Sequence, residues 1–331
     1  MVAQLNRHYL TLSPSKSVAR LLTYALFEGR PLTTRGRWIN PIVFRIGRSL
    51  MRSPASCDVK SPIYIMGQGR SGTTILGVVL SLHPQIGFLN EPKALWHNAY
   101  PFEDLVGNYT NGHVRYTLDS ADVTPEIEER FMRLYSGYLR FTRTSRILDK
   151  YPELLHRASF IHRIFPDARF IILVRNGLEV CRSIAEWSTV HGEFTISQEI
   201  DWWGRGDRKW NCLIDDLVSV EPDLMNQRDA LRPITRQQDR AALEWILTMR
   251  KTQRVAMRFP EQTLIVRYER FVQDPISSVL DILRFCDLSI DDRVLRFAAE
   301  NVQRPRTAGT VSLHKVLQEP FDALMHEYSY V

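Results

Sequence analysis

The chain contains few cysteines and no long hydrophobic run. Only four of its 331 residues are cysteines, and no two of them have C-x-x-C spacing: Cys57, Cys181, Cys212 and Cys286. We therefore expect reduced, mostly buried thiols, and neither disulfides nor a metal site. The longest apolar stretch near the start, Leu21 to Phe27, is too short to cross a bilayer. No cleavable signal pattern precedes it, so a cytoplasmic location is the expectation.

Acidic residues are scarce in the first 60 residues. This part holds ten Lys or Arg and two Asp or Glu, a net charge of +8, whereas the whole chain carries +6. We expect residues 1–60 to form a basic, mostly helical N-terminal arm. The segment Pro41 to Arg52 could form a basic amphipathic helix that makes a peripheral contact with an anionic membrane. The favoured interpretation is a helix that is docked on the core and keeps its arginines in solvent. No nucleic-acid partner is expected, because the charge lacks a recognised reading motif.

Five short apolar segments alternate with helical patterns along the chain. They are Ile63 to Met66, Ile86 to Leu89, Ile147 to Asp149, Phe170 to Val174 and Thr263 to Arg267. This alternation predicts an α/β fold in which a parallel sheet of about five strands is flanked by helices on both faces. Ligands of such sheets bind beyond the carboxyl ends of the strands. The long helical pattern from Arg240 to Arg258 is interpreted as structural.

A Gly-rich turn joins the first apolar segment to the helical run Thr74 to Leu82. Residues 67–74 read Gly-Gln-Gly-Arg-Ser-Gly-Thr-Thr. The glycines let an anion approach the backbone, and the amides at the start of a helix point at such an anion. Arg70 adds a permanent charge with a planar fork of donors. The turn therefore predicts a phosphate or sulfate site.

Three ligand templates match this turn to different degrees. As G-x-G-x-x-G it fits the dinucleotide fingerprint, and Glu91 lies about where a ribose-binding acid would stand. As G-x-x-x-x-G-K-[ST] it fails, because Thr73 replaces the lysine that reaches the β and γ phosphates. The third template fits every position: residues 70–74 resemble the [KR]-S-G-T-T loop of the sulfotransferases, whose donor is 3′-phosphoadenosine-5′-phosphosulfate (PAPS).

A second cluster supports the same resemblance. Arg175 stands at the end of the apolar run Phe170 to Val174, and Ser183 follows eight residues later in a helical pattern. This spacing resembles the arginine-serine pair that grips the 3′-phosphate in sulfotransferases. The resemblance extends from about Pro62 to about Leu288. The G-x-x-G-D-W-K element of cytosolic members is absent, and Arg306 is the candidate in its place by position alone.

The resemblance implies roles for individual residues. Glu91 is the preferred general base with His97 next, Arg70 stabilises the charge that develops on the leaving oxygen, and Lys150 steadies the sulfuryl oxygens. Other interpretations pair Glu91 with Arg70, or Lys150 with Asp149 or Glu153. The donor-binding candidates are Gln68, Gly69, Arg70, Ser71, Gly72, Thr73, Thr74, Arg175, Ser183 and Arg306.

The sequence as a whole predicts a P-loop-NTPase-like sulfotransferase fold over residues 61–331. We expect transfer of the sulfuryl group of PAPS, as co-substrate and without a metal, to a hydroxyl of a carbohydrate or glycolipid by in-line displacement. A lipid or a peptide tyrosine remains open as acceptor. The segment Asp201 to Trp210 predicts either part of an acceptor groove or a capped helix start. The alternatives are an NAD-dependent dehydrogenase that uses the G-x-G-x-x-G turn, and a non-catalytic nucleotide-binding protein.

Overall fold

The computed structural model describes residues 4–31, 34–55, 57–195, 198–303 and 311–330. Its centre is a five-stranded sheet in the order β2-β3-β1-β4-β8, and all neighbouring strands are parallel. The strands are β1 (Ile63–Gly67), β2 (Ile86–Asn90), β3 (Arg146–Lys150), β4 (Arg169–Val174) and β8 (Thr263–Arg267). The five predicted strands and the parallel α/β fold are thus confirmed.

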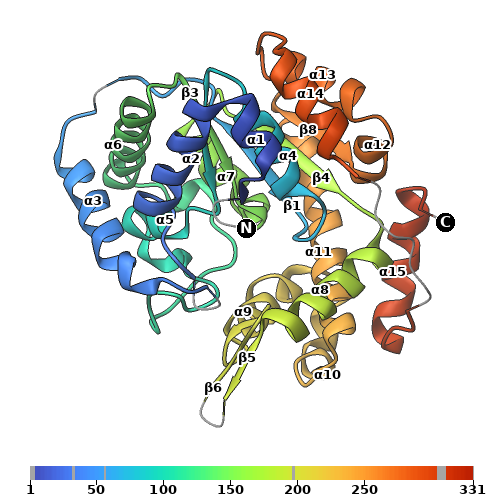
Figure 1. The fold of residues 1–331 in the computed structure, drawn as a ribbon. Coiled ribbons are helices and arrows are strands. Elements are labelled where there is room, and N and C mark those ends of the chain that lie inside the picture. The colour runs from blue at the N-terminus through green and yellow to red at the C-terminus, as the bar shows by residue number, and fades with distance from the viewer. Residues whose placement is uncertain (1–3, 32–33, 56, 196–197, 304–310, 331) are drawn as a thin grey trace.

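Helices cover both faces of this sheet (Figure 1). On one face, Ile63 and Ile65 of β1 pack in a cluster with α4 (Thr73–Ser81), α13 (Pro275–Phe285) and α14 (Asp292–Asn301). On the other face, Tyr64 and Met66 pack with α5 (Lys93–Ala99), α6 (Pro125–Thr142) and α7 (Ala158–Ile164). This division follows from the strand period of two, and it explains why β1 is buried along its whole length.

A third apolar cluster lies beyond the carboxyl end of β4. It is formed by α8 (Gly177–His191), α9 (Arg208–Asp216), α11 (Gln237–Arg258) and α15 (Lys315–Glu327). A small antiparallel sheet that the sequence did not predict stands beside it, in the order β5 (Glu193–Thr195), β6 (Gln198–Asp201) and β7 (Gly204–Arg205). In the view of Figure 1, α8, α9 and α11 lie below the main sheet.

The other described elements are α-helices and 3-10 turns. The remaining α-helices are α1 (Arg7–Leu12), α2 (Pro14–Leu26), α3 (Asn40–Arg52), α10 (Arg228–Leu231) and α12 (Tyr268–Gln273). The 3-10 turns are η2 (Arg37–Ile39), η3 (Pro101–Glu103), η4 (Ser120–Asp122), η5 (Pro152–Arg157), η6 (Val218–Val220), η7 (Met225–Gln227) and η8 (Pro260–Gln262). Within the described residues, no helix is both long and apolar enough to cross a membrane. The four cysteines are free thiols, and only Cys57 is exposed.

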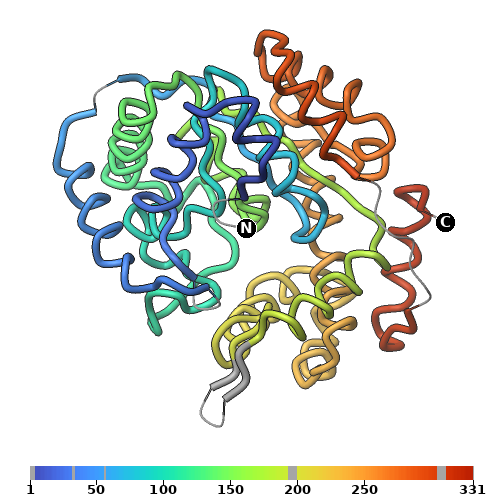
Figure 2. Tube along the Cα trace, viewed as in Figure 1, coloured from blue at the N-terminus to red at the C-terminus, as the bar shows by residue number. Residues whose placement is uncertain are grey.

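The N-terminal helices pack directly on the rest of the protein. The Tyr9 hydroxyl lies 2.8 Å from Ser81 Oγ of α4, and both side chains are buried. In α3, the buried Val43 and Gly47 face the core, which agrees with the favoured interpretation of a docked helix. Figure 2 shows this segment in blue on the side of the molecule opposite the red helix α15. A domain boundary at residue 60 stays a prediction.

A buried ion pair fixes this segment. Arg20 Nη2 donates to Glu28 Oε2 at 2.9 Å, and both side chains are less than 5% exposed. Glu28 Oε1 also accepts the backbone N–H of Asn90 at 2.6 Å, at the end of β2. The N-terminal segment therefore supports the sheet edge from which Glu91 emerges.

The pair gives a stability prediction. Replacing Arg20 by Ala leaves the Glu28 carboxylate buried without its cation, so we expect the free energy of unfolding to fall by about 3–5 kcal/mol. Urea denaturation followed by circular dichroism measures this loss. The exposed Arg7 provides the matched control, since its replacement by Ala should change stability by less than about 0.5 kcal/mol. Equal losses in the two variants would contradict the anchoring role.

Candidate active site

A cleft of about 660 Å³ opens at the carboxyl ends of the strands. The Gly-rich loop between β1 and α4 forms its floor, as expected for a parallel sheet with ligands beyond the strand ends. The residues that line it include Glu28, Arg30, Gly67, Gln68, Gly69, Arg70, Gly72, Thr73, Thr74, Glu91, Lys93, Tyr116, Lys150, Glu153, Arg175, Ser183, Trp202, Lys209, Glu244 and Tyr268. Most of the site residues predicted from sequence lie in this one cleft.

The two predicted anion-binding motifs touch each other. Arg70 Nε in the loop donates to Ser183 Oγ in α8 at 3.0 Å. Arg175 Nη1, at the end of β4, donates to the carbonyl oxygen of Arg70 at 2.7 Å. Residues more than a hundred positions apart in the sequence therefore meet at one point, and a single ligand can contact both motifs.

The charge near this contact favours an anion. Arg175 pairs with Glu179 at 2.7 Å and lies 4.3 Å from the centre of the Tyr268 ring, whereas Arg70 forms no ion pair with any residue that the structure describes. Burial, and then the nearby charge of Arg175, lower the pKa of the Arg70 guanidinium. An anion bound beside both arginines would offset this unfavourable effect of the Arg175 charge. Arg70 also has a left-handed backbone, with φ of 68°, a conformation that is uncommon for non-Gly residues.

Two aromatic rings enclose the loop. A Cβ atom at Gly69 would lie 2.6 Å from the Trp202 ring, and one at Gly72 would lie 2.5 Å from the Tyr268 ring. Because Gly72 also has φ of +87°, this position needs glycine on two grounds. Trp202 belongs to the segment for which a groove was one of two predictions, and the structure places it on the cleft wall. Tyr268 was not among the predicted site residues, because it follows β8 and reaches the loop only in the folded chain.

Glu91 and Lys150 form the pair nearest the loop on the β2 and β3 side. Lys150 Nζ donates to Glu91 Oε1 at 2.6 Å, and Lys93 Nζ lies 3.7 Å from the other carboxylate oxygen. Burial alone would raise the pKa of Glu91, but Lys150 and then Lys93 outweigh it and hold the pKa below its ordinary value. The Glu91 side chain is 38% exposed and so stays open to the cleft.

The alternative pairings for these residues are wrong. The structure pairs Glu91 with Lys150 and Lys93 and shows no ion pair to Arg70 among the described residues. Asp149 points to the other face of the sheet, where its carboxylate accepts hydrogen bonds from Trp96 and Tyr135. Glu153 pairs with Lys209 rather than with Lys150. None of the three alternative pairings forms among the described residues, because sequence alone does not show which way a side chain at a strand end turns.

His97 does not line the cleft. Its ring packs edge-on against Phe44 of α3, with the ring centres 5.8 Å apart, and also contacts Tyr109. Burial lowers the pKa of this imidazole. The structure therefore separates His97 from the Gly-rich loop and leaves Glu91 as the candidate base in the cleft.

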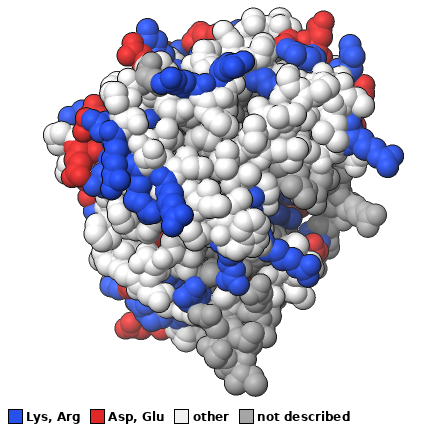
Figure 3. All heavy atoms as spheres, turned by 60° about the vertical axis from the view of Figure 1, so that its left-hand side comes forward, with Lys and Arg blue, Asp and Glu red and all other residues white. Residues whose placement is uncertain are grey.

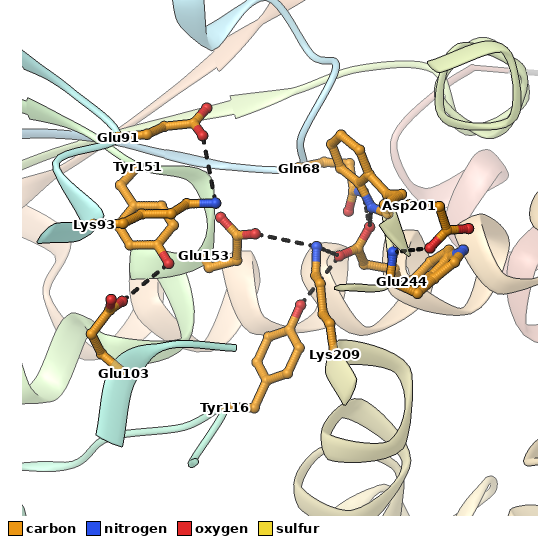
Figure 4. Close-up of polar contacts among 12 residues, drawn as sticks. Gln68, Glu91, Lys93, Glu103, Tyr116, Tyr151, Glu153, Asp201, Lys209 and Glu244 are labelled. Carbon is orange, nitrogen blue, oxygen red and sulfur yellow. Dashed lines mark hydrogen bonds and ion pairs between the residues drawn. The ribbon is translucent and has the colours of Figure 1, made fainter. Parts of the chain in front are cut away.

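The wall opposite Glu91 holds a buried network that sequence reasoning missed (Figure 4). Lys209 Nζ contacts Glu244 at 2.6 Å and Glu153 at 3.2 Å, and its side chain is 2% exposed. Glu244 Oε2 also accepts hydrogen bonds from Gln68 Nε2 at 2.9 Å and from Trp202 Nε1 at 3.0 Å. The network thus fixes both a loop residue and the ring that covers the loop. Glu244 lies in the helix that was interpreted as structural. The signal that could have identified it is an acidic residue on the buried face of that helical pattern.

The loop has the features of a site that binds an anionic ligand. The amides at the start of α4 point at the cleft, and the positive end of the helix dipole favours an anion there. Thr73 and Thr74 line the cleft at the start of α4, whereas Ser71 is fully buried behind it. Arg306, the remaining donor-binding candidate, lies outside the described residues.

The fold and this cleft define an α/β protein with a Gly-rich strand-loop-helix junction at the carboxyl ends of its parallel strands. The sequence model of the sulfotransferase family matches residues 62–227. Since this is half of the chain, the protein belongs to the sulfotransferase family, and its parallel sheet with the phosphate loop after β1 is the P-loop-like fold expected for it.

Individual relatives are distant. An uncharacterized protein of Aquifex aeolicus is 24% identical over 250 residues, which cover 72% of this chain and 27% of that protein. Protein-tyrosine sulfotransferase 1 of Danio rerio is 25% identical over 257 residues, covering 77% of this chain and 59% of its own length. The chain thus spans between about a quarter and three fifths of these curated relatives.

The solved structures share less sequence identity with this chain than these relatives do. A sulfotransferase of Mycobacterium tuberculosis is 13% identical with a TM-score of 0.49, covering 98% of this chain and 94% of the other. The sulfotransferase domain of a Synechococcus olefin synthase is 18% identical with a TM-score of 0.47, covering 85% and 99%.

The Lys209 network predicts a pH-dependent contribution to stability. Burial would raise the pKa of Glu153, but Lys209 and then Lys93 lower it from 4.5 to about 2. A carboxyl whose pKa falls on folding adds stability above its unfolded pKa and loses it as pH decreases. Lys209→Met should therefore lower the free energy of unfolding at pH 7 by on the order of 3 kcal/mol, and the difference from wild type should shrink between pH 4.5 and about 2.

Urea titrations at a series of pH values measure this difference. Lys60→Met is the matched control, since the Lys60 side chain is 76% exposed and its replacement should have little effect at any pH. A loss in Lys209→Met that does not vary with pH would mean that the side chain acts through packing rather than through its charge.

Proposed function

We propose that this protein transfers the sulfuryl group of PAPS to a hydroxyl of a carbohydrate or glycolipid acceptor. The observation that carries the proposal is the direct contact between the Gly-rich loop and the arginine-serine pair, through Arg70, Ser183 and Arg175. A nucleotide with phosphates at both its 5′ and 3′ positions needs two anion-binding groups side by side. A dinucleotide without a 3′-phosphate has no need of the second group.

Different residues would bind the two ends of the donor. The loop amides, Thr73 and Thr74 would hold the 5′-phosphosulfate at the positive end of α4. Arg175 and Ser183 would hold the 3′-phosphate, since both line the cleft beside the loop. When bound, the donor supplies an activated sulfuryl group, and Arg70 lies where its charge can stabilise the leaving oxygen.

Glu91 would accept the proton of the acceptor hydroxyl. Its lowered pKa keeps it ionised at neutral pH, but the ion pair with Lys150 also makes it a weaker base. An anion bound beside Lys150 would compete with Glu91 for that ammonium and so raise the pKa of the carboxyl. Glu91 would then be a stronger base when the donor is bound than when the donor is absent.

The opposite wall favours a neutral acceptor. There a single ammonium, Lys209, lies between two carboxylates, Glu153 and Glu244, so the group carries a net negative charge. Tyr116 and Trp202 place aromatic rings next to these polar groups, a mixture that suits a sugar, which has apolar faces and many hydroxyls. The named relatives favour a second candidate, the phenolic hydroxyl of a peptide tyrosine.

The donor assignment gives a binding prediction. By isothermal titration calorimetry, the protein should bind adenosine 3′,5′-bisphosphate and not NAD. Arg175→Ala should weaken the bisphosphate by about 10- to 100-fold, the cost of losing a charged hydrogen bond, and should change the affinity for adenosine 5′-phosphate much less. Arg163→Ala, on an exposed helix position, is the control. Tight binding of NAD without binding of the bisphosphate would end the proposal in favour of a dehydrogenase.

The base assignment gives a kinetic prediction. Glu91→Gln should lower kcat by about 10²- to 10⁴-fold, the usual effect of removing a positioned base, while bisphosphate affinity is kept. His97→Gln, outside the cleft, should leave kcat nearly unchanged. Labelled donor offered with neutral oligosaccharides, glycolipids and a tyrosyl peptide identifies the acceptor. The opposite ranking of the two variants would assign the base to His97, and bisphosphate binding without any labelled acceptor would favour a non-catalytic protein.

A further inference from the structure

The helix α2 exposes an apolar stripe to solvent. Val18, Leu21 and Leu22 are 58%, 42% and 43% exposed. Their spacing of three and four residues places them on one side of the helix, opposite the buried Ser17, Arg20 and Thr23 that face the protein. Isolated exposed apolar residues are ordinary, but three on one helix face form a surface that water solvates poorly.

The neighbouring segment combines apolar and basic side chains. Trp38 is 77% exposed and Ile42 is 42% exposed. Helix α3, which packs against α2, continues from Ile42 with the exposed Arg45, Arg48 and Arg52 and contains no acidic residue. Among the described residues, no carboxylate forms an ion pair with these three arginines. We call these side chains, with the exposed ones of α2, the α2–α3 surface.

Basic side chains gather on this side of the protein. Figure 3 shows the left-hand side of Figure 1, where α2 and α3 lie, with a diagonal row of basic side chains that has a broad area free of charged residues on one side and acidic side chains on the other. Of the two acidic residues before position 61, Glu28 is buried and paired with Arg20, and only Asp58 is exposed. A surface with apolar side chains beside a row of cations complements an anionic lipid bilayer, in which acyl chains lie beneath negative headgroups.

The α2–α3 surface is continuous with the cleft. The segment between the two helices includes Glu28, Gly29, Arg30 and Pro31, which line the cleft on their inner side. Arg30 is 6% exposed and packs over the Tyr24 ring of α2, 3.4 Å from its centre. One stretch of chain therefore forms the edge of the cleft and joins the two helices that carry the outer surface.

We propose that the α2–α3 surface docks on an anionic membrane, and that the acceptor reaches the cleft from the bilayer as a lipid-linked hydroxyl compound. Trp38 and the α2 stripe enter the interface between headgroups and acyl chains, and Arg45, Arg48 and Arg52 contact the headgroups. The docking itself rests on the exposed side chains alone, whereas the nature of the acceptor rests on the proposed function.

Vesicle co-sedimentation of the full chain tests the docking. Wild type should bind vesicles that contain phosphatidylglycerol, should bind pure phosphatidylcholine vesicles much less, and should lose affinity as salt increases. Two variants should each bind at least about tenfold more weakly: Leu21→Ser with Trp38→Ser, and Arg45→Gln with Arg48→Gln and Arg52→Gln. Met257→Ser, which is 74% exposed on α11, and Arg284→Gln on α13 are matched controls and should bind as wild type does.

Other outcomes overturn the proposal. Absence of binding to phosphatidylglycerol vesicles, or equal losses in the control variants, would do so. If sedimentation velocity shows a dimer that the α2–α3 variants dissociate, and vesicles do not bind, this surface is an interface between copies of the chain. Circular dichroism melting curves establish that each variant is folded.

The docking and the proposed function can fail separately. Titration with adenosine 3′,5′-bisphosphate in the absence of vesicles measures only the donor site, and the α2–α3 variants should retain wild-type affinity there. Sulfation of a soluble acceptor without vesicle binding would remove the docking and leave the function. Vesicle binding without bisphosphate binding would leave the docking and remove the function.

Discussion

The contact between the loop after β1 and the end of β4 determines what this protein can bind. It brings Arg70 and Arg175 together with only one carboxylate, Glu179, paired to them among the described residues. Holding two guanidiniums in one place costs free energy in the absence of a ligand, and the adjacent parallel strands β1 and β4 supply the rigid frame that maintains it. The site is thus organised before the ligand arrives, so a bis-anionic ligand loses little free energy in ordering it.

The order of the strands distributes the chemistry across the cleft. With β1 in the centre, the loop has β4 and its Arg175 on one side, and β3 and β2 with Lys150 and Glu91 on the other. Arg175 and the candidate base Glu91 therefore lie on opposite sides of the loop, with Lys150 on the side of Glu91. Glu91 has a left-handed backbone, with φ of 48°, and the Glu28 carboxylate holds the preceding Asn90 N–H. The N-terminal segment thus contributes to the position of the base as well as to the edge of the cleft.

Sequence reasoning succeeded where the determinants are local. Each of the five strands is a short apolar run, and the Gly-rich turn and the spacing of Arg175 and Ser183 are contained in continuous segments. It failed where the partners are far apart in the chain: Glu244 meets Lys209, Gln68 and Trp202 only after four separate segments have packed together. His97 illustrates the reverse error, because its distance from Glu91 in sequence is small but its ring turns toward α3. Which face a side chain takes depends on tertiary packing, which a local pattern does not encode.

The two buried lysines of the cleft differ in the net charge of their surroundings. This difference decides which lysine can bind an anionic group of a substrate. Lys209 lies between two carboxylates, so its ammonium is already satisfied and its surroundings repel a further anion. Lys150 shares the single carboxylate of Glu91 with Lys93, which leaves a net positive charge beside the loop. A sulfuryl group would therefore be drawn to the Lys150 side. Because Glu91 loses part of its ion pair at that moment, the same displacement that binds the sulfuryl oxygens would also strengthen the base.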